Sequence, residues 1–308
     1  MPAIELDGVT KRFDDVTAVD DLSMTVPEGE VFGFLGPNGA GKSTTINMLL
    51  DFVRPTTGTV SVLGMDAQER GVAVRERTGV LPEGFSVYER LTGRQHIEFA
   101  IESKTVDADP EAVLERVGLD GEGDRKAGGY SKGMGQRLAL GMALVGDPDL
   151  LILDEPSSGL DPAGAKEMRE IVREESSRGA TVFFSSHVLG QVEAVCDTVG
   201  ILREGRLVAR DSVEGLRDAV GGGATLSITV DSASEEQLEP VRRIGGVDSA
   251  MTDGGTVSVQ CDPEAKTDVI GALEGEGVSV KDFETRESSL EDLFLAYTED
   301  EAATEVEA

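Results

Sequence analysis

Residues 31–35 (VFGFL) form a short apolar run, and the glycine-rich stretch GPNGAGKST follows at once. The stretch consists of Gly36, Pro37, Asn38, Gly39, Ala40, Gly41, Lys42, Ser43 and Thr44. This is the P-loop pattern, in which glycines let the backbone curl so that its N–H groups point at phosphate. Lys42 supplies a positive charge for the outer phosphates, and the Ser43 hydroxyl suits Mg²⁺. Since the next residues have helical spacing, we expect a strand, a phosphate loop and a helix that bind ATP and Mg²⁺.

A second apolar run, LLILD at 150–154, ends in a pair of carboxylates. We expect Asp154 to hold the Mg²⁺ shell and Glu155 to polarise the attacking water. A third run, TVFFSS at 181–186, precedes His187, which could contact the terminal phosphate or the water. The other histidine, His96, lies inside a helical pattern, and we expect it to be structural or solvated.

The pattern along the chain predicts an α/β fold with a largely parallel sheet. Residues 1–30 alternate apolar and polar positions, which predicts a small antiparallel sheet. Residues 85–145 are mostly helical, with helices expected from about Gly93 to Glu102, Pro110 to Val117 and Gly135 to Leu144. After residue 218 the order strand, helix (EEQLEPVRRI, 235–244), two strands, helix, strand predicts a small ferredoxin-like α+β domain. We therefore expect domains at 1–218 and 219–298, with a disordered acidic tail at 299–308. An apolar stripe formed by Leu290, Leu293, Phe294 and Tyr297 should belong to a last helix in the core of the second domain.

Composition limits the possible partners. The 308 residues carry a formal charge of −31, with 59 acidic and 28 basic residues, which argues against a nucleic-acid partner. This excess of carboxylates leads to the hypothesis of a protein adapted to high salt, which unfolding at increasing KCl concentration tests. No apolar run is long enough to span a bilayer, so a cytoplasmic location is expected, and a membrane role requires a partner. Cys196 and Cys261 show no metal or redox spacing, and we expect buried thiols.

Three further segments narrow the choice among nucleotide hydrolases. Residues 130–137 (YSKGMGQR) resemble the signature motif of the ABC ATPases, usually LSGGQxQR. Residues 157–162 (SSGLDP) resemble the D-loop of that family, and Ser186-His187 resembles its switch histidine. Phe13 resembles the aromatic residue that stacks on adenine. The motifs occur in the family's order, and the resemblance covers residues 1–218.

The resemblance implies an ABC ATPase domain with an antiparallel β subdomain and a helical subdomain. It implies that two subunits, either identical or a pair of different ATPases, close head to tail over two ATP molecules. Ser131 and Gly133 of one subunit would then donate to the terminal phosphate bound by the other. Glu155 would be the general base, His187 would orient water and phosphate, and Asp161 would link the two sites. The implied partner is a separate membrane permease that holds the chain at the inner face of the cell membrane.

The sequence departs from the family pattern at two places. The signature has Tyr130, Lys132 and Met134 where leucine, glycine and glutamine are usual, and Glu83 replaces the glutamine that reaches Mg²⁺. A carboxylate at 83 remains a suitable Mg²⁺ ligand. Together with the additional C-terminal domain, these departures resemble the drug and antibiotic efflux branch, which implies export.

Other functional classes remain open at this stage. One is a soluble ABC ATPase that remodels ribosomes or DNA, although the chain has one P-loop and a strongly acidic composition. Another is a module that uses ATP as a clamp without hydrolysis, which the presence of Glu155 and His187 opposes. The third is an ordinary P-loop kinase, which needs no signature motif.

Overall fold

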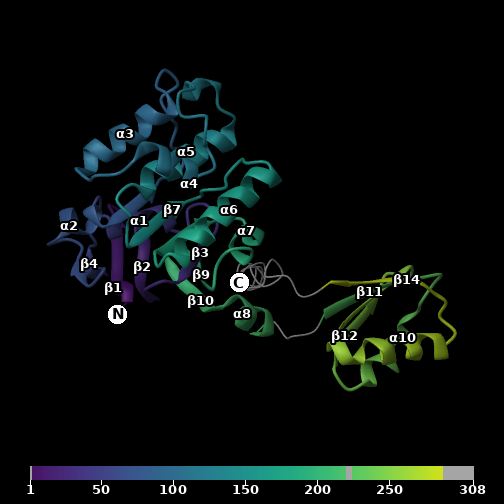
Figure 1. Cartoon of the computed structure of the whole chain (residues 1–308). Helices are drawn as coiled ribbons and strands as arrows, with labels where there is room; N and C mark the ends of the chain where they lie inside the picture. Colours follow the sequence, from purple (N-terminus) through teal and green to yellow (C-terminus); the bar gives the residue numbers. More distant parts are fainter. Residues whose placement is uncertain (1, 220–223, 287–308) are drawn as a thin grey trace. The chain divides into compact units, whose positions relative to one another are not determined.

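The computed structural model describes residues 2–219 and 224–286, and the chain divides into two compact units, Met1–Val213 and Glu214–Ala308 (Figure 1). The predicted last helix, its apolar stripe, the acidic tail and Gly221–Gly223 lie outside the described residues. No helix in the described part of the chain is long and apolar enough to cross a membrane.

An antiparallel sheet forms one layer of the first unit. Its strand order is β2-β1-β4-β5, with bounds Pro2–Phe13 for β1, Val16–Pro27 for β2, Thr57–Val62 for β4 and Met65–Asp66 for β5. Ile4 and Leu6 are buried whereas Glu5 and Asp7 are exposed, as a sheet with one covered face requires. The antiparallel sheet predicted for residues 1–30 is present.

The second sheet has the strand order β10-β9-β3-β8-β7-β6. Its strands are β3 (Val31–Leu35), β6 (Thr78–Leu81), β7 (Leu150–Asp154), β8 (Thr181–Ser186), β9 (Thr198–Arg203) and β10 (Arg206–Ser212). All neighbours pair in parallel except β10, which is antiparallel to β9. Every residue of β3, β7 and β8 is buried, because helices or the other sheet cover both faces.

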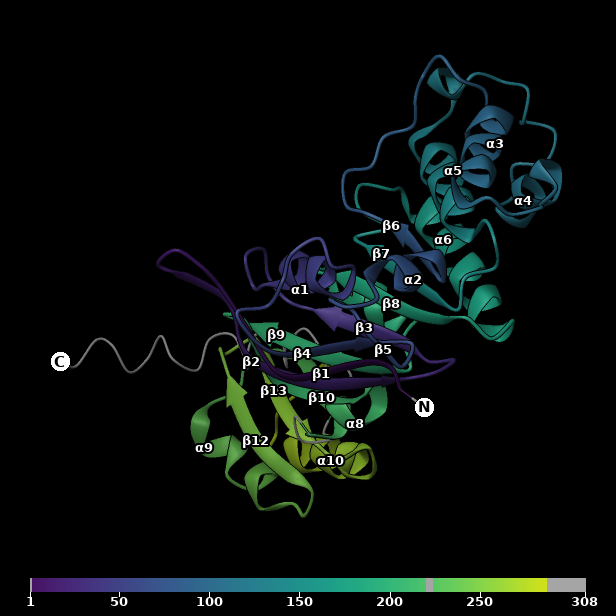
Figure 2. The same cartoon turned by 90° about the vertical axis from the view of Figure 1, so that its left-hand side faces the viewer.

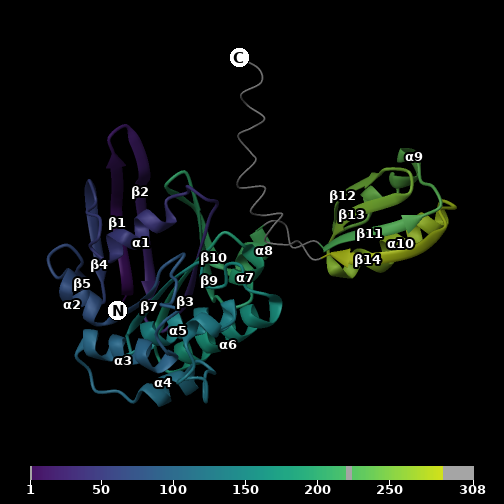
Figure 3. The ribbon, with the colours of Figure 1, turned by 90° about the horizontal axis from the view of Figure 1, so that it is seen from above.

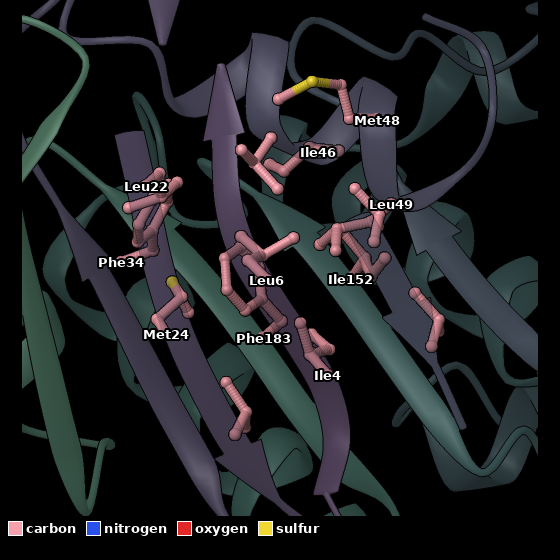
Figure 4. Close-up of a cluster of buried hydrophobic side chains, with 14 of the residues drawn as sticks. Ile4, Leu6, Leu22, Met24, Phe34, Ile46, Met48, Leu49, Ile152 and Phe183 are labelled. Atoms are coloured by element: carbon pink, nitrogen blue, oxygen red, sulfur yellow. The ribbon is translucent and has the colours of Figure 1, made fainter. Parts of the chain in front are cut away.

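Helix α1 (Lys42–Leu49) lies between the two sheets and contacts β2, β4 and β7. Figure 4 shows Ile46, Met48 and Leu49 of α1 gathered with side chains from both sheets, among them Leu6, Phe34 and Phe183. On the other face, α6 (Pro162–Ser177) and α7 (Leu189–Glu193) pack on β8. Helix α7 also contacts β3, and Figure 3 shows these two elements side by side. The short α2 (Gly71–Glu76) precedes β6. The helix that follows the phosphate loop is therefore held in place by a hydrophobic core that contains side chains from both sheets.

Three further helices gather in one part of this unit (Figure 2): α3 (Gly93–Lys104), α4 (Pro110–Arg116) and α5 (Lys132–Leu144). A 3₁₀ turn, Ala127–Gly129, leads into α5. His96 of α3 is buried, and its Nδ1 lies 2.7 Å from the Thr92 carbonyl oxygen while its Nε2 accepts from the Tyr88 N–H at 2.9 Å. The structural role expected for His96 is confirmed, and the solvated alternative is wrong.

The sequence pattern placed the start of α5 at Gly135, which is wrong by three residues. The helix begins at Lys132 because the Ser131 hydroxyl accepts from the Met134 N–H and caps the first turn. The glycines of the signature segment therefore belong to the helix rather than to a preceding loop.

The second unit contains α8 (Val213–Ala219), which begins at the boundary, and a sheet of order β12-β13-β11-β14. Its elements are β11 (Ala224–Val230), α9 (Glu235–Leu238), β12 (Val247–Thr252), β13 (Thr256–Cys261), α10 (Lys266–Gly275) and β14 (Val280–Arg286), with 3₁₀ turns at Val241–Arg243 and Pro263–Ala265. All pairs are antiparallel, in the order that a ferredoxin-like βαββαβ chain gives. The continuous helix predicted over 235–244 is wrong, because Pro240 lacks an N–H and separates α9 from the turn.

Candidate nucleotide-binding and hydrolysis site

The parallel sheet places the predicted chemical groups at one edge. The order β3-β8-β7-β6 puts four carboxyl ends side by side. The phosphate loop follows β3, His187 follows β8, Asp154 ends β7, and Glu83 comes two residues after β6. Ligands of open α/β sheets bind at this edge, because the loops that leave the strands there converge.

A cavity of ≈ 290 Å³ opens at this edge. Its lining contains the predicted residues of the loop and the carboxylates, together with Ala18 of β2: Ala18, Pro37, Asn38, Gly39, Gly41, Lys42, Ser43, Thr44, Glu83, Asp154 and Glu155. Gly36 and Ala40 of the predicted loop are buried behind this lining. Gly41 has φ 106, and a Cβ there would meet the Ala18 carbonyl oxygen at 2.4 Å, so only glycine fits.

Lys42 is buried, and its ammonium group lies beside the first two residues of the loop. Its Nζ donates to the Gly36 carbonyl at 2.7 Å and to the Pro37 carbonyl at 3.4 Å, and it lies 3.7 Å from Glu155 Oε1. Phosphate oxygens are charged acceptors and hence stronger partners than these carbonyls. These hydrogen bonds position the Lys42 ammonium group beside the cavity, and a phosphate can replace them.

Glu155 joins the phosphate loop to the predicted switch histidine. Its Oε1 lies 2.8 Å from His187 Nδ1, and its backbone N–H donates to the Ser185 carbonyl at 3.2 Å. The side chain is 4% exposed, whereas that of His187 is 43% exposed. Glu155 also adopts φ 51, a left-handed conformation that costs an L-residue about 1–2 kcal/mol. A buried carboxylate with an oriented histidine partner can take a proton from a water molecule in the cavity.

The donor set at this edge suits Mg²⁺ bound mainly through a nucleotide. Asp154 is buried, with Oδ1 accepting from the Ser185 hydroxyl, and Ser43 and Glu83 line the same cavity. Within residues 2–219 and 224–286, no group of three or more His, Cys, Asp or Glu is placed to hold a metal. Since Mg²⁺ in nucleotide sites takes one or two carboxylates and completes its shell with phosphates and water, these residues fit it.

Four predicted residues lie away from this cavity. Ser131 and Asp161 are the N-caps of α5 and α6, where Asp161 accepts from the Gly164 N–H at 3.1 Å. Ser131 lines a separate cavity of ≈ 270 Å³, and Gly133 follows in the first turn of α5. Phe13 is 44% exposed at the end of β1, with Lys11 Nζ 4.7 Å from its ring centroid.

The signature departures have structural partners. The Tyr130 hydroxyl donates to the Glu122 carbonyl at 2.7 Å, and partial burial raises the pKa of Tyr130. The Lys132 ammonium lies against Gly159 of the D-loop, where it would be 2.0 Å from an added Cβ. Tyr130 is thus hydrogen-bonded to one neighbouring loop of the same chain, and Lys132 packs against another.

Sequence reasoning missed Ser185, whose hydroxyl contacts both Asp154 and the Glu155 N–H. Two serines at the end of the apolar run 181–186 were the available signal, because buried strand ends seldom carry hydroxyls without a partner. The contact of Ala18 with the cavity could not be read from the sequence, since it depends on how the two sheets meet.

Comparison with known families gives two matches along the chain. Residues 19–158 match the family model described as ABC transporter. Residues 212–298 match the model described as ATP-binding protein DrrA1-3-like, C-terminal domain.

Curated relatives cover nearly the whole chain. An uncharacterized ABC transporter ATP-binding protein, YhcH of Bacillus subtilis, is 35% identical and covers 96% of this chain and 95% of its own length. The daunorubicin resistance ATP-binding protein DrrA3 of Streptomyces coeruleorubidus is 32% identical over 97% of this chain and 96% of its own. The bacitracin transport ATP-binding protein BcrA of Bacillus licheniformis is 40% identical over 67% of this chain and 68% of its own.

Solved structures share the fold. The ATP-binding subunit of an ABC transporter superposes with a TM-score of 0.64 at 28% identity, covering 71% of this chain and 93% of that one. The ADP conformation of an ATP-binding cassette gives a TM-score of 0.63 at 25% identity, covering 70% of this chain and 92% of that one.

Proposed function

The chain belongs to the ABC transporter ATP-binding proteins, which hydrolyse ATP to power transport, and from this premise we propose that two copies close head to tail over two ATP molecules. One observation carries the proposal. Ser131, Gly133 and Asp161 do not line the cavity that holds Lys42 and Glu155. Since the signature donors of one chain lie away from its own phosphate loop, a second chain must supply them.

Each residue then has one task. Lys42 and the loop N–H groups bind the phosphates, Glu155 accepts the proton of the attacking water, and His187 holds Glu155 and orients the water. Ser131 and Gly133 of the second copy donate to the terminal phosphate and exclude water from that side. Asp154, Ser43 and Glu83 would hold Mg²⁺, which neutralises phosphate charge when bound. Phe13 stacks on adenine.

A mixture of two inactive variants tests the head-to-tail arrangement. Glu155→Gln removes the base, and Ser131→Arg blocks the signature donors. In a mixed pair, one site combines the intact Glu155 of one chain with the intact Ser131 of the other. We expect an equimolar mixture to regain about a quarter of the wild-type ATPase rate, because half of random pairs are mixed and each holds one intact site of two.

Each variant alone is the control, and both should remain inactive at every protein concentration. A mixture that stays inactive while light scattering or cross-linking shows mixed pairs contradicts the arrangement. A wild-type chain that keeps its full ATPase rate at dilutions where no pairs form would place both residues at one site of a single chain.

A membrane permease is the second proposed partner. A cavity of ≈ 280 Å³ lies between β6, α3 and α5, with a mainly apolar lining that includes Phe85, Phe99 and Met142. Phe99 is 57% exposed. Leu81 and Pro82 line this groove, and the next residue, Glu83, lines the nucleotide cavity. We assign the groove to an apolar cytoplasmic helix of the permease, because the same short segment borders both sites.

Co-purification from detergent-solubilised membranes tests this partner. A multi-spanning protein should be recovered with the tagged chain, and Phe99→Asp should abolish its recovery while leaving the ATPase rate of the isolated chain unchanged. Phe52→Asp is a matched control, because Phe52 is 63% exposed and lies outside the groove. Recovery of a soluble or ribosomal complex instead would support the remodelling class.

We also propose export, with the chain at the inner face of the cell membrane. The support is the efflux-type relatives, which include daunorubicin resistance and bacitracin transport proteins. ATP added to inside-out vesicles that contain the chain and its permease should load labelled daunorubicin or bacitracin into the lumen if either is carried. ATP-driven loss of such a compound from the lumen would contradict export.

A further inference from the structure

The hairpin of β9 and β10 contacts the phosphate loop, although its residues do not line the cavity. Its turn is Glu204–Gly205, and both residues have positive φ, 50 and 81. Strand β9 pairs in parallel with β3, the strand that leads into the loop. The hairpin is therefore placed beside the loop by the sheet itself.

Both ends of the loop rest on this hairpin. A Cβ on Gly36, where the loop begins, would meet the Leu202 carbonyl oxygen of β9 at 2.5 Å. Where the loop ends, the Gly205 N–H donates to the Ala40 carbonyl at 2.9 Å. A Cβ on Gly41 would lie 3.5 Å from Gly205 Cα. The two glycines of the loop thus allow the hairpin backbone to approach closely.

Gly205 also holds β2, on its other side. The Asp20 N–H donates to the Gly205 carbonyl at 2.9 Å, and Arg206 forms an exposed ion pair with Asp20. The three atoms nearest to a Cβ on Gly205 would all be backbone atoms, namely Val19 Cα at 2.9 Å, the Ala18 oxygen at 3.0 Å and the Asp20 nitrogen at 3.1 Å. Because backbone cannot rotate away as a side chain can, any larger residue must displace the turn or β2.

The hydrogen bond to Ala40 has a consequence for the next N–H. In a planar trans peptide the C=O and N–H point in opposite directions. Since the Ala40 carbonyl is held toward the hairpin, the N–H of Gly41 in the same peptide is turned away from it. Gly41 lines the nucleotide cavity, where an N–H is a donor to phosphate.

We propose that Gly205 is a positioning residue for nucleotide binding, which orients the Gly41 peptide toward the phosphates from outside the cavity. The proposal rests on the proposed use of residues 36–44 as the phosphate loop. It gives the turn between β9 and β10 a role in affinity rather than in the chemical step.

The test is Gly205→Ala in the full chain, with ADP·Mg²⁺ binding measured by calorimetry. We expect the Kd for ADP to rise by about tenfold or more, because one charge-assisted donor is misdirected. In ATPase assays KM should rise similarly, while kcat at saturating ATP stays within about twofold. Gly29→Ala is the matched control, since Gly29 also has positive φ (77) but a Cβ there meets nothing within 4 Å.

The possible outcomes distinguish a failure of the role proposed for Gly205 from a failure of the phosphate-loop assignment. If Gly205→Ala and Gly29→Ala bind ADP equally well, or if kcat falls with KM unchanged, the role of Gly205 is refuted. If Lys42→Ala retains full ADP affinity, the phosphate-loop assignment fails first.

If Gly205→Ala does not fold, Arg206→Gln replaces it, with Arg77→Gln as control because Arg77 forms a comparable exposed ion pair with Asp149. Arg206→Gln should raise the Kd for ADP about twofold and Arg77→Gln should not. Equal affinities in these two variants also refute the role of the turn.

Discussion

The carboxyl edge of the parallel sheet and the amino end of α5 differ in how complete they are within one chain. At the sheet edge, Glu155 already contacts both Lys42 and His187, and it is buried and strained. At α5, Ser131 is exposed and satisfies only its own helix, through the Met134 N–H. The comparison indicates that one chain assembles the general base and the phosphate loop by itself. Its signature donors, in contrast, are available to the nucleotide of a second chain.

The largest expected effect comes from a substitution at the sheet edge, which we call the complete region because Lys42, Glu155 and His187 are already assembled there. Glu155→Gln should lower the ATPase rate by about 1,000-fold, because the amide cannot accept the water proton. The Kd for ADP should change by less than about threefold, since the phosphate loop is intact. Steady-state ATPase assays and calorimetry measure the two effects. Glu174→Gln, an exposed carboxylate of α6, is the control and should retain full activity.

Ser131→Arg disrupts the amino end of α5, which we call the incomplete region because its donors do not reach the cavity of their own chain. Hydrolysis should fall by roughly 100- to 1,000-fold, because donors to the terminal phosphate are blocked at the closed interface. ADP binding to the dilute chain should not change, since Ser131 lies outside the cavity of its own chain. A loss of ADP affinity in this variant would mean that the two regions already meet within one chain.

His187→Ala sharpens the description of the complete region. Because Nδ1 lies 2.8 Å from Glu155 Oε1, its removal should free the carboxylate and lower kcat by about 10- to 100-fold. KM for ATP should stay within about twofold, since Lys42 and the loop remain. A larger change in KM than in kcat, measured in the same titration, would assign His187 to nucleotide binding instead.

The smallest expected effect concerns Asp161, the cap of α6. Asp161→Ala should reduce the free energy of unfolding by about 1 kcal/mol, because the Gly164 N–H loses its acceptor. Asp161→Asn keeps an acceptor and should cost far less. Urea unfolding compares the two. Any ATPase loss in Asp161→Asn at unchanged stability then reports the proposed link between the two sites.

The residues that line the nucleotide cavity were largely predictable. The phosphate loop, Asp154 and Glu155 lie at the ends of short apolar runs, and these runs indicate buried strands. What could not be predicted depends on tertiary approach. The turn at Gly205 touches the loop only because β9 pairs with β3. The start of α5 and the break at Pro240 were misjudged because a local cap and a missing N–H override the apolar spacing on which the predictions relied.

The buried histidine of α3 has a mechanical consequence. The segment from Pro82 to Thr92 leaves β6 at one end and caps α3 at the other, and His96 Nε2 fastens it again at the Tyr88 N–H. The segment is thus fixed at both ends. Glu83 lies near its first end and lines the nucleotide cavity, whereas Phe85 lines the apolar groove. Between these ends Gly84 has φ 70, and a Cβ there would meet nothing within 4 Å, so this glycine beside Glu83 is where the backbone of the connection can most easily change.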